Sequence, residues 1–408
     1  MEEWKEYKLG EVSNIQTGPF GSQLHQRDYV DEGTPCIMPT NIGIHLDILS
    51  DGIAKVKSED VNRLKKHCVK VGDIIYSRRG DIEKCAYITQ KEEGWLCGTG
   101  CLRIRIESEI TNPHFIAYQL CTKECKSWIV GNAIGTTMLN LNSGILKELP
   151  LLIPNKQQQD KIVSILKSLD DKIEVNRKIN ENLEQQAQAL FKSWFVDFEP
   201  FKDGEFVDSE LGMIPKGWSV GTLGDICSQS SLKVESRDDV KVLSPVTTGN
   251  LMLSEEYFTK QVFSESIAKY KVVNKGAFAY NPARVNIGSL GRNEYDFDGA
   301  VSPVYVVFEC KEGYSNYFDL FRTTEKFKTE VLLRAIGGVR QSLNYVDFAM
   351  IQTIIAPQDV VDAFNPMFER LKSIKKHLEK ENNRLATLRD TLLPKLMLGE
   401  LKVNEVEI

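Results

Sequence analysis

The sequence predicts an α+β fold in which one unit occurs twice, each time as a mixed, β-rich globular domain followed by a long helix. Three observations predict it: a set of motifs returns half a chain later, two segments carry coiled-coil spacing, and short β-rich runs fill the rest. The 408 residues suffice for two or three domains. We expect one globular domain over 1–154, a helix over 155–199, a second domain over 200–357, and a helix with a tail over 358–408.

The repeat is visible in motifs that keep their order. The opening motif is Trp, then Leu-Gly, an acidic residue and an aliphatic one, and it begins at Trp4 and again at Trp218. Ala-Ile-Gly followed by Leu-Asn occurs from Ala133 and again from Ala335. Each copy then reaches an apolar run that ends in proline, predicting a strand: Leu149 to Pro154 and Ile351 to Pro357. The chain is therefore two copies of one unit.

Each copy ends in a segment with a 4-3-4-3 spacing, which is typical of a coiled-coil seam. The first seam is Ile162, Leu166, Leu169, Ile173, Asn176, Asn180, Leu183, Ala187, Leu190 and Trp194. The second is Phe364, Phe368, Leu371, Lys375, Leu378, Asn382, Leu385, Arg389, Leu392 and Leu396. We expect the two helices to pair as an antiparallel coiled coil, with pseudo-two-fold symmetry. Asn180 and Asn382 then fix the register near the axis, unless both side chains point to solvent at the edge of the seam.

Composition excludes several classes of protein. The net charge is −6, and none of the four segments carries more Lys and Arg than Asp and Glu, which argues against nonspecific coating of nucleic acid. We find no phosphate-binding glycine loop, no metal-ligand spacing and no nucleophile–histidine pattern, so no catalytic, metal or cofactor site is expected. The nine cysteines fit reduced, mostly buried thiols, and the absence of a long apolar run or signal peptide predicts a cytoplasmic protein.

Over essentially its full length the chain resembles the specificity (S) subunits of type I restriction–modification systems. The resemblance rests on the duplicated opening motif, Thr17-Gly-Pro-Phe-Gly-Ser-Gln-Leu24, Gly72-Asp-Ile-Ile-Tyr-Ser-Arg-Arg-Gly80, the boundary Leu211-Gly-Met-Ile-Pro-Lys-Gly-Trp218, and Tyr280-Asn-Pro-Ala-Arg-Val-Asn-Ile-Gly288. It implies two target recognition domains that each read half of a bipartite, asymmetric sequence in double-stranded DNA.

The resemblance also implies partners. The paired helices would dock two methyltransferase (M) subunits, and restriction (R) subunits would join them in an adenine-N6 methyltransferase and ATP-dependent endonuclease. S-adenosylmethionine, ATP and Mg²⁺ would bind those partners and not this chain, which would be no enzyme on its own. The alternative is a coiled-coil interaction scaffold whose two domains bind protein. Steep salt dependence would distinguish the DNA reader from the scaffold.

DNA contacts are predicted from side chains that can pair with bases or phosphates and that stand on loops beside glycine. The candidates in the first domain are Thr17, Phe20, Ser22, Gln23, Arg78 and Arg79; those in the second are Arg284, Asn286, Ser289, Arg340 and Gln341. Arg284 and Asn286 alternate, so they are expected on one strand face. The alternatives left open are a salt bridge from Arg78 or Arg79 to Asp81 or Glu83, a core or anchoring role for Phe20, and turn-capping roles for the second set.

Overall fold

The computed structural model describes residues 4–135, 139–258, 263–264, 266–335 and 342–403. By its internal contacts the chain divides into two units: unit 1 joins residues 1–176 to 380–408, and unit 2 is residues 177–379. Each unit holds one globular domain and half of each long helix, α6 (Lys156–Phe195) and α12 (Gln358–Met397). The contacts therefore group the chain differently from the linear order of domain, helix, domain and helix.

Unit 1 contains two four-stranded sheets within the described residues, and the strand order is β2-β9-β6-β7 in one and β3-β5-β4-β8 in the other. A third, two-stranded pairing joins β1 to β10, so the start of the domain lies beside its end. The elements are β1 (Lys5–Lys8), α1 (Leu9–Val12), β2 (Ser13–Thr17), β3 (Tyr29–Val30), β4 (Thr34–Ile37), β5 (Lys55–Val56), α2 (Ser58–Arg63), β6 (Ile74–Ser77), β7 (Cys85–Tyr87), β8 (Leu96–Cys97), β9 (Cys101–Ile106), α3 (Pro113–Leu120), α4 (Lys123–Asn132), α5 (Ser143–Lys147) and β10 (Pro150–Ile153).

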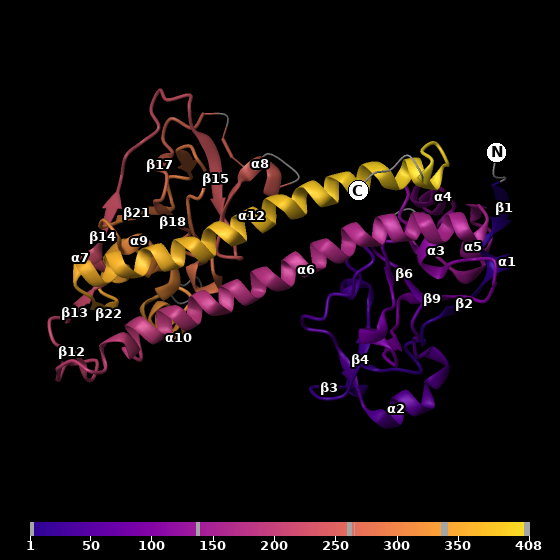
Figure 1. Cartoon of the computed structure of the whole chain (residues 1–408), viewed down its shortest axis with the longest axis horizontal. Coiled ribbons are helices and arrows are strands. Elements are labelled where there is room, and N and C mark those ends of the chain that lie inside the picture. The colour runs from indigo at the N-terminus through magenta and orange to yellow at the C-terminus, as the bar shows by residue number, and fades with distance from the viewer. Residues whose placement is uncertain (1–3, 136–138, 259–262, 265, 336–341, 404–408) are drawn as a thin grey trace. The chain divides into compact units, whose positions relative to one another are not determined.

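Unit 2 repeats this topology, with sheets β14-β21-β18-β19 and β16-β15-β20-β17 and the pairing β13-β22. The paired strands β13 and β22 lie side by side in Figure 1. The second four-stranded sheet differs in one strand between the two units. In unit 1 this strand is β3, which pairs with β5, whereas in unit 2 it is β17, which pairs with β20. The elements are β11 (Phe206–Val207), β12 (Ile214–Pro215), β13 (Ser219–Thr222), α7 (Leu223–Ile226), β14 (Cys227–Ser230), β15 (Lys241–Pro245), β16 (Leu251–Leu253), α8 (Ser254–Tyr257), β17 (Lys271–Val273), β18 (Phe278–Tyr280), β19 (Leu290–Arg292), β20 (Gly299–Val301), β21 (Val306–Cys310), α9 (Tyr314–Phe321), α10 (Glu325–Arg334), α11 (Tyr345–Ala349) and β22 (Gln352–Ile355). The predicted α+β repeat is confirmed.

The repeated opening motif forms the same turn in both units. The leucine is fully buried, and its backbone N–H donates to the residue before the closing strand, Leu149 or Ile351, at 2.9 Å in each case. The acidic residue three positions after the strand end accepts from that strand's last backbone N–H, at 2.8 Å in unit 1 and 2.7 Å in unit 2. This capping arrangement explains why Leu-Gly and an acid recur together.

The Leu-Asn motif has an equally local cause. Leu141 and Leu343 are fully buried, and the asparagine that follows each one caps a short helix. The side-chain oxygens of Asn142 and Asn344 each accept a backbone N–H two to three residues into the helix, at 2.9 Å in both units. Asparagine is among the best residues at this position, so the motif marks the start of α5 and of α11.

The two long helices run antiparallel in each unit, as predicted. In unit 1, Asp170 pairs with Arg389 at 2.7 Å and Asn176 with Asn382 at 2.9 Å. In unit 2, Lys375 pairs with Glu184 at 2.5 Å, and the rings of Trp194 and Phe364 lie 5.7 Å apart. Residue numbers thus rise on α6 as they fall on α12. The predicted seam of α6 is buried from Ile162 through Asn176, and Leu183 and Ala187 are buried beyond it.

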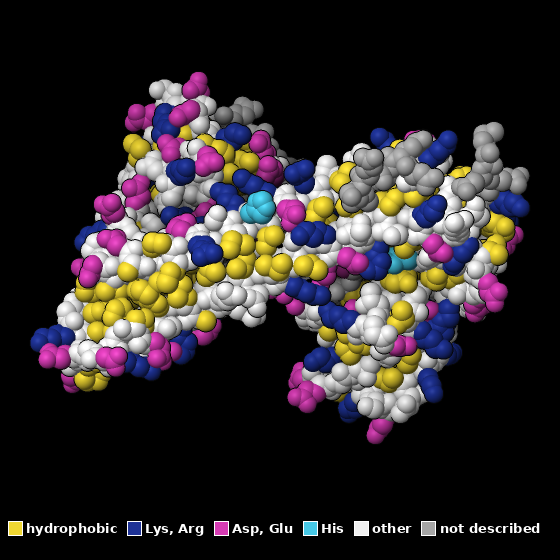
Figure 2. All heavy atoms as spheres, viewed as in Figure 1, with side chains coloured by type: hydrophobic (Ala, Val, Ile, Leu, Met, Phe, Trp, Pro, Cys, Tyr) yellow, Lys and Arg dark blue, Asp and Glu magenta, His cyan; other side chains and the backbone are white. Residues whose placement is uncertain are grey.

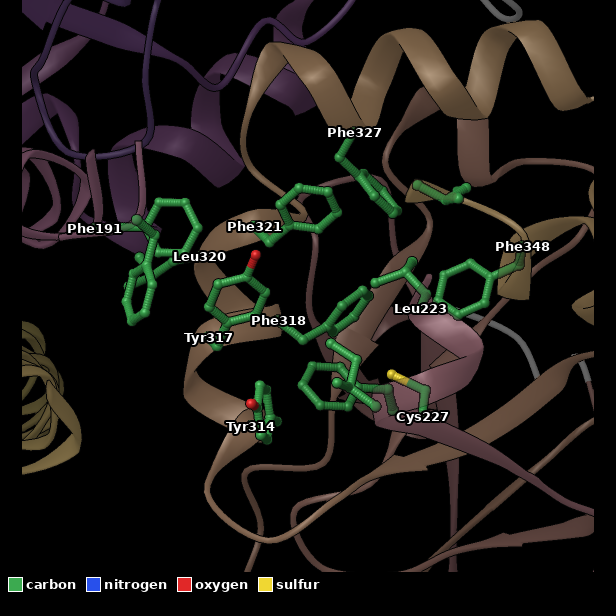
Figure 3. Packing of buried hydrophobic residues seen from close by; sticks show 14 of the residues in the cluster. Phe191, Leu223, Cys227, Tyr314, Tyr317, Phe318, Leu320, Phe321, Phe327 and Phe348 are labelled. Carbon is green, nitrogen blue, oxygen red and sulfur yellow. The ribbon is translucent and has the colours of Figure 1, made fainter. Parts of the chain in front are cut away.

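The cores of the two units differ in composition. The larger core of unit 1 is mainly Leu and Ile from the sheet, α3 and the helix ends. That of unit 2 is dominated by Phe and Tyr, including Phe318 and Phe348 (Figure 3). The rings of Phe278 and Phe308 stack on each other, and each meets the Phe318 ring edge-on. Each core includes residues of α6 and α12, so each domain is anchored to the helix pair by apolar burial. Among the described residues, no helix is long and apolar enough to span a bilayer.

Candidate nucleic-acid interface

The first candidate surface is the loop Gly18–Gln23, which follows β2 in unit 1. Gly18 lies so close to the backbone of Gly98 that a Cβ would stand 2.0 Å from its carbonyl oxygen, so no other residue fits without a shift of the backbone. The Thr99 hydroxyl donates to the carbonyl of Pro19 at 2.9 Å and ties the two loops together. Glycine at position 18 thus allows the two backbones to pack closely, and the contacts with Gly98 and Thr99 hold the loop in place.

The predicted contact residues on this loop differ in exposure. Ser22 is exposed, Thr17 and Gln23 are half-buried, and the Gln23 side-chain oxygen accepts the backbone N–H of Phe20 at 3.2 Å. The Phe20 side chain is 56% exposed, so the alternative that it belongs to the core is wrong. An exposed aromatic ring on a fixed loop can contact a base or a sugar, although it can also contact protein.

Arg78 and Arg79 extend the same surface from the end of β6. The Arg78 guanidinium lies 6.0 Å from the centre of the Phe20 ring, and its Nε donates to the side-chain oxygen of Asn140 at 3.4 Å. Arg79 is exposed. Within the described residues neither arginine forms an ion pair with Asp81 or Glu83, and Asp81 pairs with Lys84 instead. The structure therefore brings Phe20 and Arg78 together.

The second candidate surface follows β18 in unit 2. Arg284 and Asn286 are exposed, but the strand predicted for them is wrong: Val285–Ile287 is a short 3₁₀ turn. β18 ends at Tyr280, the Asn281 side chain accepts the backbone N–H of Ala283 at 3.1 Å, and Gly288 closes the turn with a φ of +93°. A proline after Asn281 favours such a turn over continued pairing.

The other predicted residues of the second set are placed differently. Ser289 is 2% exposed, and its hydroxyl donates to the carbonyl of Pro245 at 2.6 Å, so it supports the backbone and offers no surface to a ligand. The position of Ser289 therefore does not support the prediction that it contacts DNA. Arg340 and Gln341 lie outside the described residues. Sequence alternation alone could not distinguish Ser289 from its exposed neighbours.

The two candidate surfaces occupy equivalent places in the repeat. In unit 1 the buried Leu141 donates its backbone N–H to the carbonyl of Arg78 at 3.0 Å; in unit 2 Leu343 donates to Pro282 at 3.1 Å. In each domain the residues just before the short helix, α5 or α11, therefore contact the backbone just after the central strand, β6 or β18. Both domains present arginine side chains from this place, and unit 2 also presents the amide of Asn286. Such side chains can donate to phosphate oxygens and to the base edges of duplex DNA.

Inside the helix pair, the register residue differs from the one predicted. Asn382 is bonded to Asn176, which is fully buried and also donates to Glu381 at 2.7 Å. Asn180 is half-buried, and its side-chain oxygen has no hydrogen-bond partner among the described residues. Adding the repeat offset links Asn180 to Asn382, but antiparallel helices match residues whose numbers change in opposite directions. The direction must be combined with the register, which the pairing of Asp170 with Arg389 fixes, to identify Asn176 as the partner of Asn382.

The helix pair in unit 2 carries a groove of about 500 Å³. Its lining is mostly apolar and is formed by Gln186, Ala189, Leu190, Ser193, Met367, Arg370 and Leu371. Hydrophobic side chains gather over these helices in Figure 2. Contiguous exposed apolar surface on helices is typical of a protein-binding face.

Several known proteins have sequences similar to this chain. Residues 1–185 match the family model "Type I restriction modification DNA specificity domain". The chain is 27% identical to the type I restriction enzyme MjaIX specificity subunit of Methanocaldococcus jannaschii, over 99% of this chain and 95% of that protein. It is 32% identical to the HindI specificity subunit of Haemophilus influenzae, over 50% of this chain and 43% of that one.

A solved structure supports the fold. The S subunit of a type I restriction–modification system from M. genitalium superposes with a TM-score of 0.57 at 16% identity, covering 97% of this chain and 96% of that one. At this identity the likeness concerns the fold alone. The two-domain, two-helix organisation described above is therefore shared by a solved protein over nearly its whole length.

Proposed function

We propose that the chain is a specificity subunit of a type I restriction–modification system and that it reads a bipartite, asymmetric sequence in double-stranded DNA. Each target recognition domain would read one half-site. The observation that carries the proposal is the pair of equivalent surfaces, Phe20 with Arg78 and Arg79 in unit 1 and Arg284 with Asn286 in unit 2. Two related domains with different exposed side chains are suited to two different half-sites.

We further propose that the chain leaves catalysis to its partners. Two methyltransferase subunits would dock on the helix pair, and the apolar groove between Leu190 and Met367 supports this location. Those subunits would bind S-adenosylmethionine and methylate adenine at N6. Restriction subunits would bind ATP and Mg²⁺ and cleave unmethylated DNA. We propose that the assembly acts in the cytoplasm.

The decisive measurement is single-molecule methylation sequencing of host DNA with and without this gene, in the presence of its modification subunits. We expect N6-methyladenine to be lost from one bipartite motif when the gene is removed. Binding of the assembled complex to a duplex with that motif should weaken steeply with salt, because phosphate contacts release counterions. A scaffold that binds only protein would leave methylation unchanged, and a duplex would not compete with its ligand.

Exchange of residues 1–154 for the matching domain of a relative tests the division of labour. One half-site of the methylated motif should change, while the other half and the unread spacer stay the same. The matched control is exchange of residues 200–357, which should change the opposite half. A motif that changes in both halves, or in neither, contradicts the proposal that one domain reads one half-site.

The helix pair should set the spacer. Insertion of one heptad between Asn176 and Leu183, together with one between Leu378 and Leu385, keeps both seams in phase. Seven residues lengthen a helix by about 10 Å, or about three base pairs. We expect a motif with a longer spacer and unchanged half-sites. An insertion in one helix alone is the control, and it should disrupt the seam and abolish methylation.

A further inference from the structure

We propose that the turn between β15 and β16, Thr247–Asn250, is a base-reading element of the second domain, and that Arg322 and Asp319 are the residues that position it. The inference rests on the proposed DNA-reading function and deepens it. It names a segment that the sequence motifs do not single out and a device that holds this segment rigid. The ligand is the edge of base pairs in duplex DNA.

The turn presents polar side chains to solvent on a closed backbone. Thr247, Thr248 and Asn250 are all exposed. Val246 donates its N–H to the carbonyl of Asn250 at 3.0 Å, Gly249 donates back to Val246 at 3.1 Å, and Gly249 has a φ of +83°. Asparagine can bond adenine bidentately, and a threonine methyl can contact the methyl of thymine. The composition of the turn therefore fits readout of an A·T pair.

The turn is also continuous with the surface that carries Arg284 and Asn286. A Cβ on Gly288 would stand 2.6 Å from the carbonyl oxygen of Thr247, and one on Gly291 would stand 2.4 Å from the carbonyl carbon of Asn250. The buried Ser289 hydroxyl donates to Pro245 at the base of the turn. The turn is therefore packed directly against the segment that follows Arg284, so both can face one ligand.

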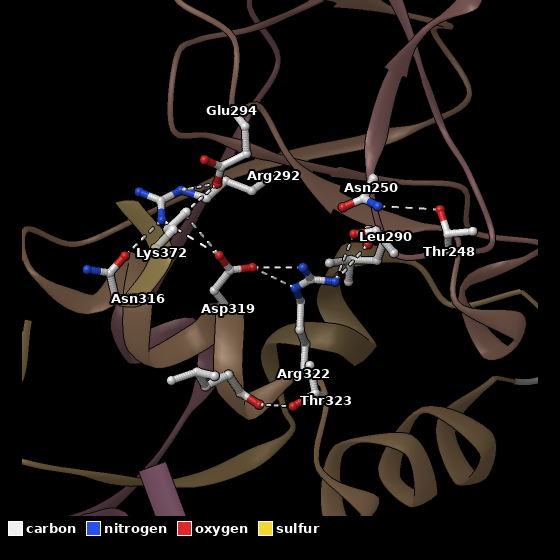
Figure 4. A network of polar contacts seen from close by, with 12 residues as sticks. Thr248, Asn250, Leu290, Arg292, Glu294, Asn316, Asp319, Arg322, Thr323 and Lys372 are labelled. Carbon is white, nitrogen blue, oxygen red and sulfur yellow. Dashed lines mark hydrogen bonds and ion pairs between the residues drawn. The ribbon is translucent and has the colours of Figure 1, made fainter. Parts of the chain in front are cut away.

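Arg322 fixes the turn from below (Figure 4). Its Nη1 donates to the carbonyls of Gly249 at 3.0 Å and Leu290 at 3.1 Å, so one guanidinium joins the two packed segments. Its Nε donates to Asp319 at 2.9 Å. The Asp319 side chain is only 10% exposed. It also forms ion pairs with Arg292 at 3.8 Å and with Lys372 of α12 at 3.5 Å. The network connects an exposed turn to the long helix through charge-assisted contacts, which are the stronger ones.

This network belongs to the particular turn and not to the shared fold. At the corresponding position after α3 in unit 1 stands Cys121, whose sulfur lies 3.7 Å from that of Cys85. In unit 1, too, the connection from β4 to β5 runs from residue 38 to 54 and contains no counterpart of the short Thr-Thr-Gly-Asn turn. In unit 1 a different set of residues, Asp170, Arg389 and His45, reaches the longer connection. The contact of Arg322 with the turn backbone therefore goes with the short turn of unit 2 and fits a role in holding it. Rigid support of a reading side chain is what specific base readout requires.

The test uses the complete chain with its modification subunits and reads the methylated motif by single-molecule sequencing. Asn250→Ala should relax one position in the half-site of the second domain, with discrimination falling about 10-fold, within the range for one lost bidentate base contact. Asn250→Asp should shift that position from adenine toward cytosine, since a carboxylate accepts from the cytosine amino group. Gln229→Ala, an exposed amide on β14 of the same unit, is the matched control and should change nothing.

Arg322→Lys tests the positioning role. It keeps a positive charge beside Asp319 but lacks the guanidinium fork that reaches Gly249 and Leu290. We expect relaxation at the same motif position as in Asn250→Ala, whereas simple destabilisation would lower methylation evenly at all sites. A bipartite motif that stays unchanged in Asn250→Ala and Asn250→Asp overturns the inference and leaves the proposed function intact. If the unaltered chain directs no bipartite methylation, the proposed function fails, and the inference fails with it.

Discussion

The two units have one topology but are held to the long helices by different chemistry. In unit 1, the Tyr118 hydroxyl donates to Asp170 of α6 at 2.6 Å, and Asp170 pairs with Arg389 of α12, which in turn lies 2.8 Å from a ring nitrogen of His45. In unit 2, the place of Tyr118 in the repeat is taken by Asp319, which receives Arg322, Arg292 and Lys372. Both chains of contacts run from a long helix to the connection that follows β4 or β15.

The comparison distinguishes the features that both domains need for the fold from the features that differ between them. The strand pairings, the capped turns and the asparagine caps recur because they depend on backbone geometry. The core side chains and the polar contacts to the helices do not recur, since any set that fills the volume and satisfies its polar groups will serve. Domains built in this way can change their exposed loops without losing their attachment to the helix pair.

The largest expected effect is on the free energy of unfolding, when the carboxylate that links each domain to the long helices is removed. Asp319→Ala leaves three cationic side chains without their shared carboxylate in a nearly buried site, so it should lower the free energy of unfolding of unit 2 by about 3–5 kcal/mol. Asp170→Ala should cost unit 1 about 1–3 kcal/mol, because Asp170 is 26% exposed and water can replace it.

Hydrogen exchange, resolved by peptide, measures each unit separately in these variants. The attraction of Arg322, Lys372 and Arg292 outweighs burial and holds the pKa of Asp319 below its usual range, which agrees with a strongly paired carboxylate. Equal losses in the two variants, or a loss spread over both units in Asp319→Ala, would contradict this comparison.

Acid should destabilise unit 1 before unit 2. His114 is stacked between Tyr87 and Tyr118, with ring centres 4.0 and 4.9 Å away, and burial lowers its pKa to about 4. Burial also lowers the pKa of His45 and of His67. Because these values lie below that of an unfolded histidine, about 6.5, the unfolded chain takes up protons first, and stability falls with pH from about 6.5 to about 4.

For His114 the loss should reach about 3 kcal/mol at the lower end of this range. In unit 2 the one histidine, His377, is exposed on α12. Peptide-resolved hydrogen exchange at pH 7 and pH 5, corrected for intrinsic rates, should therefore show unit 1 opening first. His114→Phe keeps an aromatic ring in the stack and cannot bind a proton, so it should flatten the profile of unit 1. Earlier opening of unit 2 would refute the assignment.

The smallest expected effect concerns the helix pair within unit 1. Replacement of both Asn176 and Asn382 by Leu fills a buried polar site with apolar side chains and should raise the unfolding free energy by about 1–2 kcal/mol. The same change removes the hydrogen bond that favours one alignment. We therefore expect a less specific register, measured by disulfide trapping between cysteines introduced on the two helices. A variant with a single trapped register would show that the apolar seam alone sets the alignment.

Much of the fold could be predicted because its signals are local or periodic. The motif repeat, the seam from Ile162 onward and the strands that end in proline each depend on a few neighbouring residues. The candidate site was harder, because exposure depends on packing from distant segments. Ser289 and Asn286 are polar residues of the same loop in the sequence, but Ser289 is buried with its hydroxyl on Pro245, whereas Asn286 is exposed. Asn176 was missed for a related reason, since its partner depends on the register of the two helices, which contacts elsewhere along them set.

Unit 1 is built from two stretches that lie far apart in the sequence, residues 1–176 and 380–408. This affects the order in which the two units can fold while the chain is being synthesised. Leu396 and Met397 of α12 are fully or almost fully buried in the unit 1 core, and Gly399 lies against the indole of Trp4. Unit 2 is one continuous stretch and can close once its own residues have emerged. The first domain to be synthesised must instead wait, with part of its apolar core uncovered, for residues translated after unit 2. Nascent unit 1 is thus the part of the molecule with the greatest need of a chaperone.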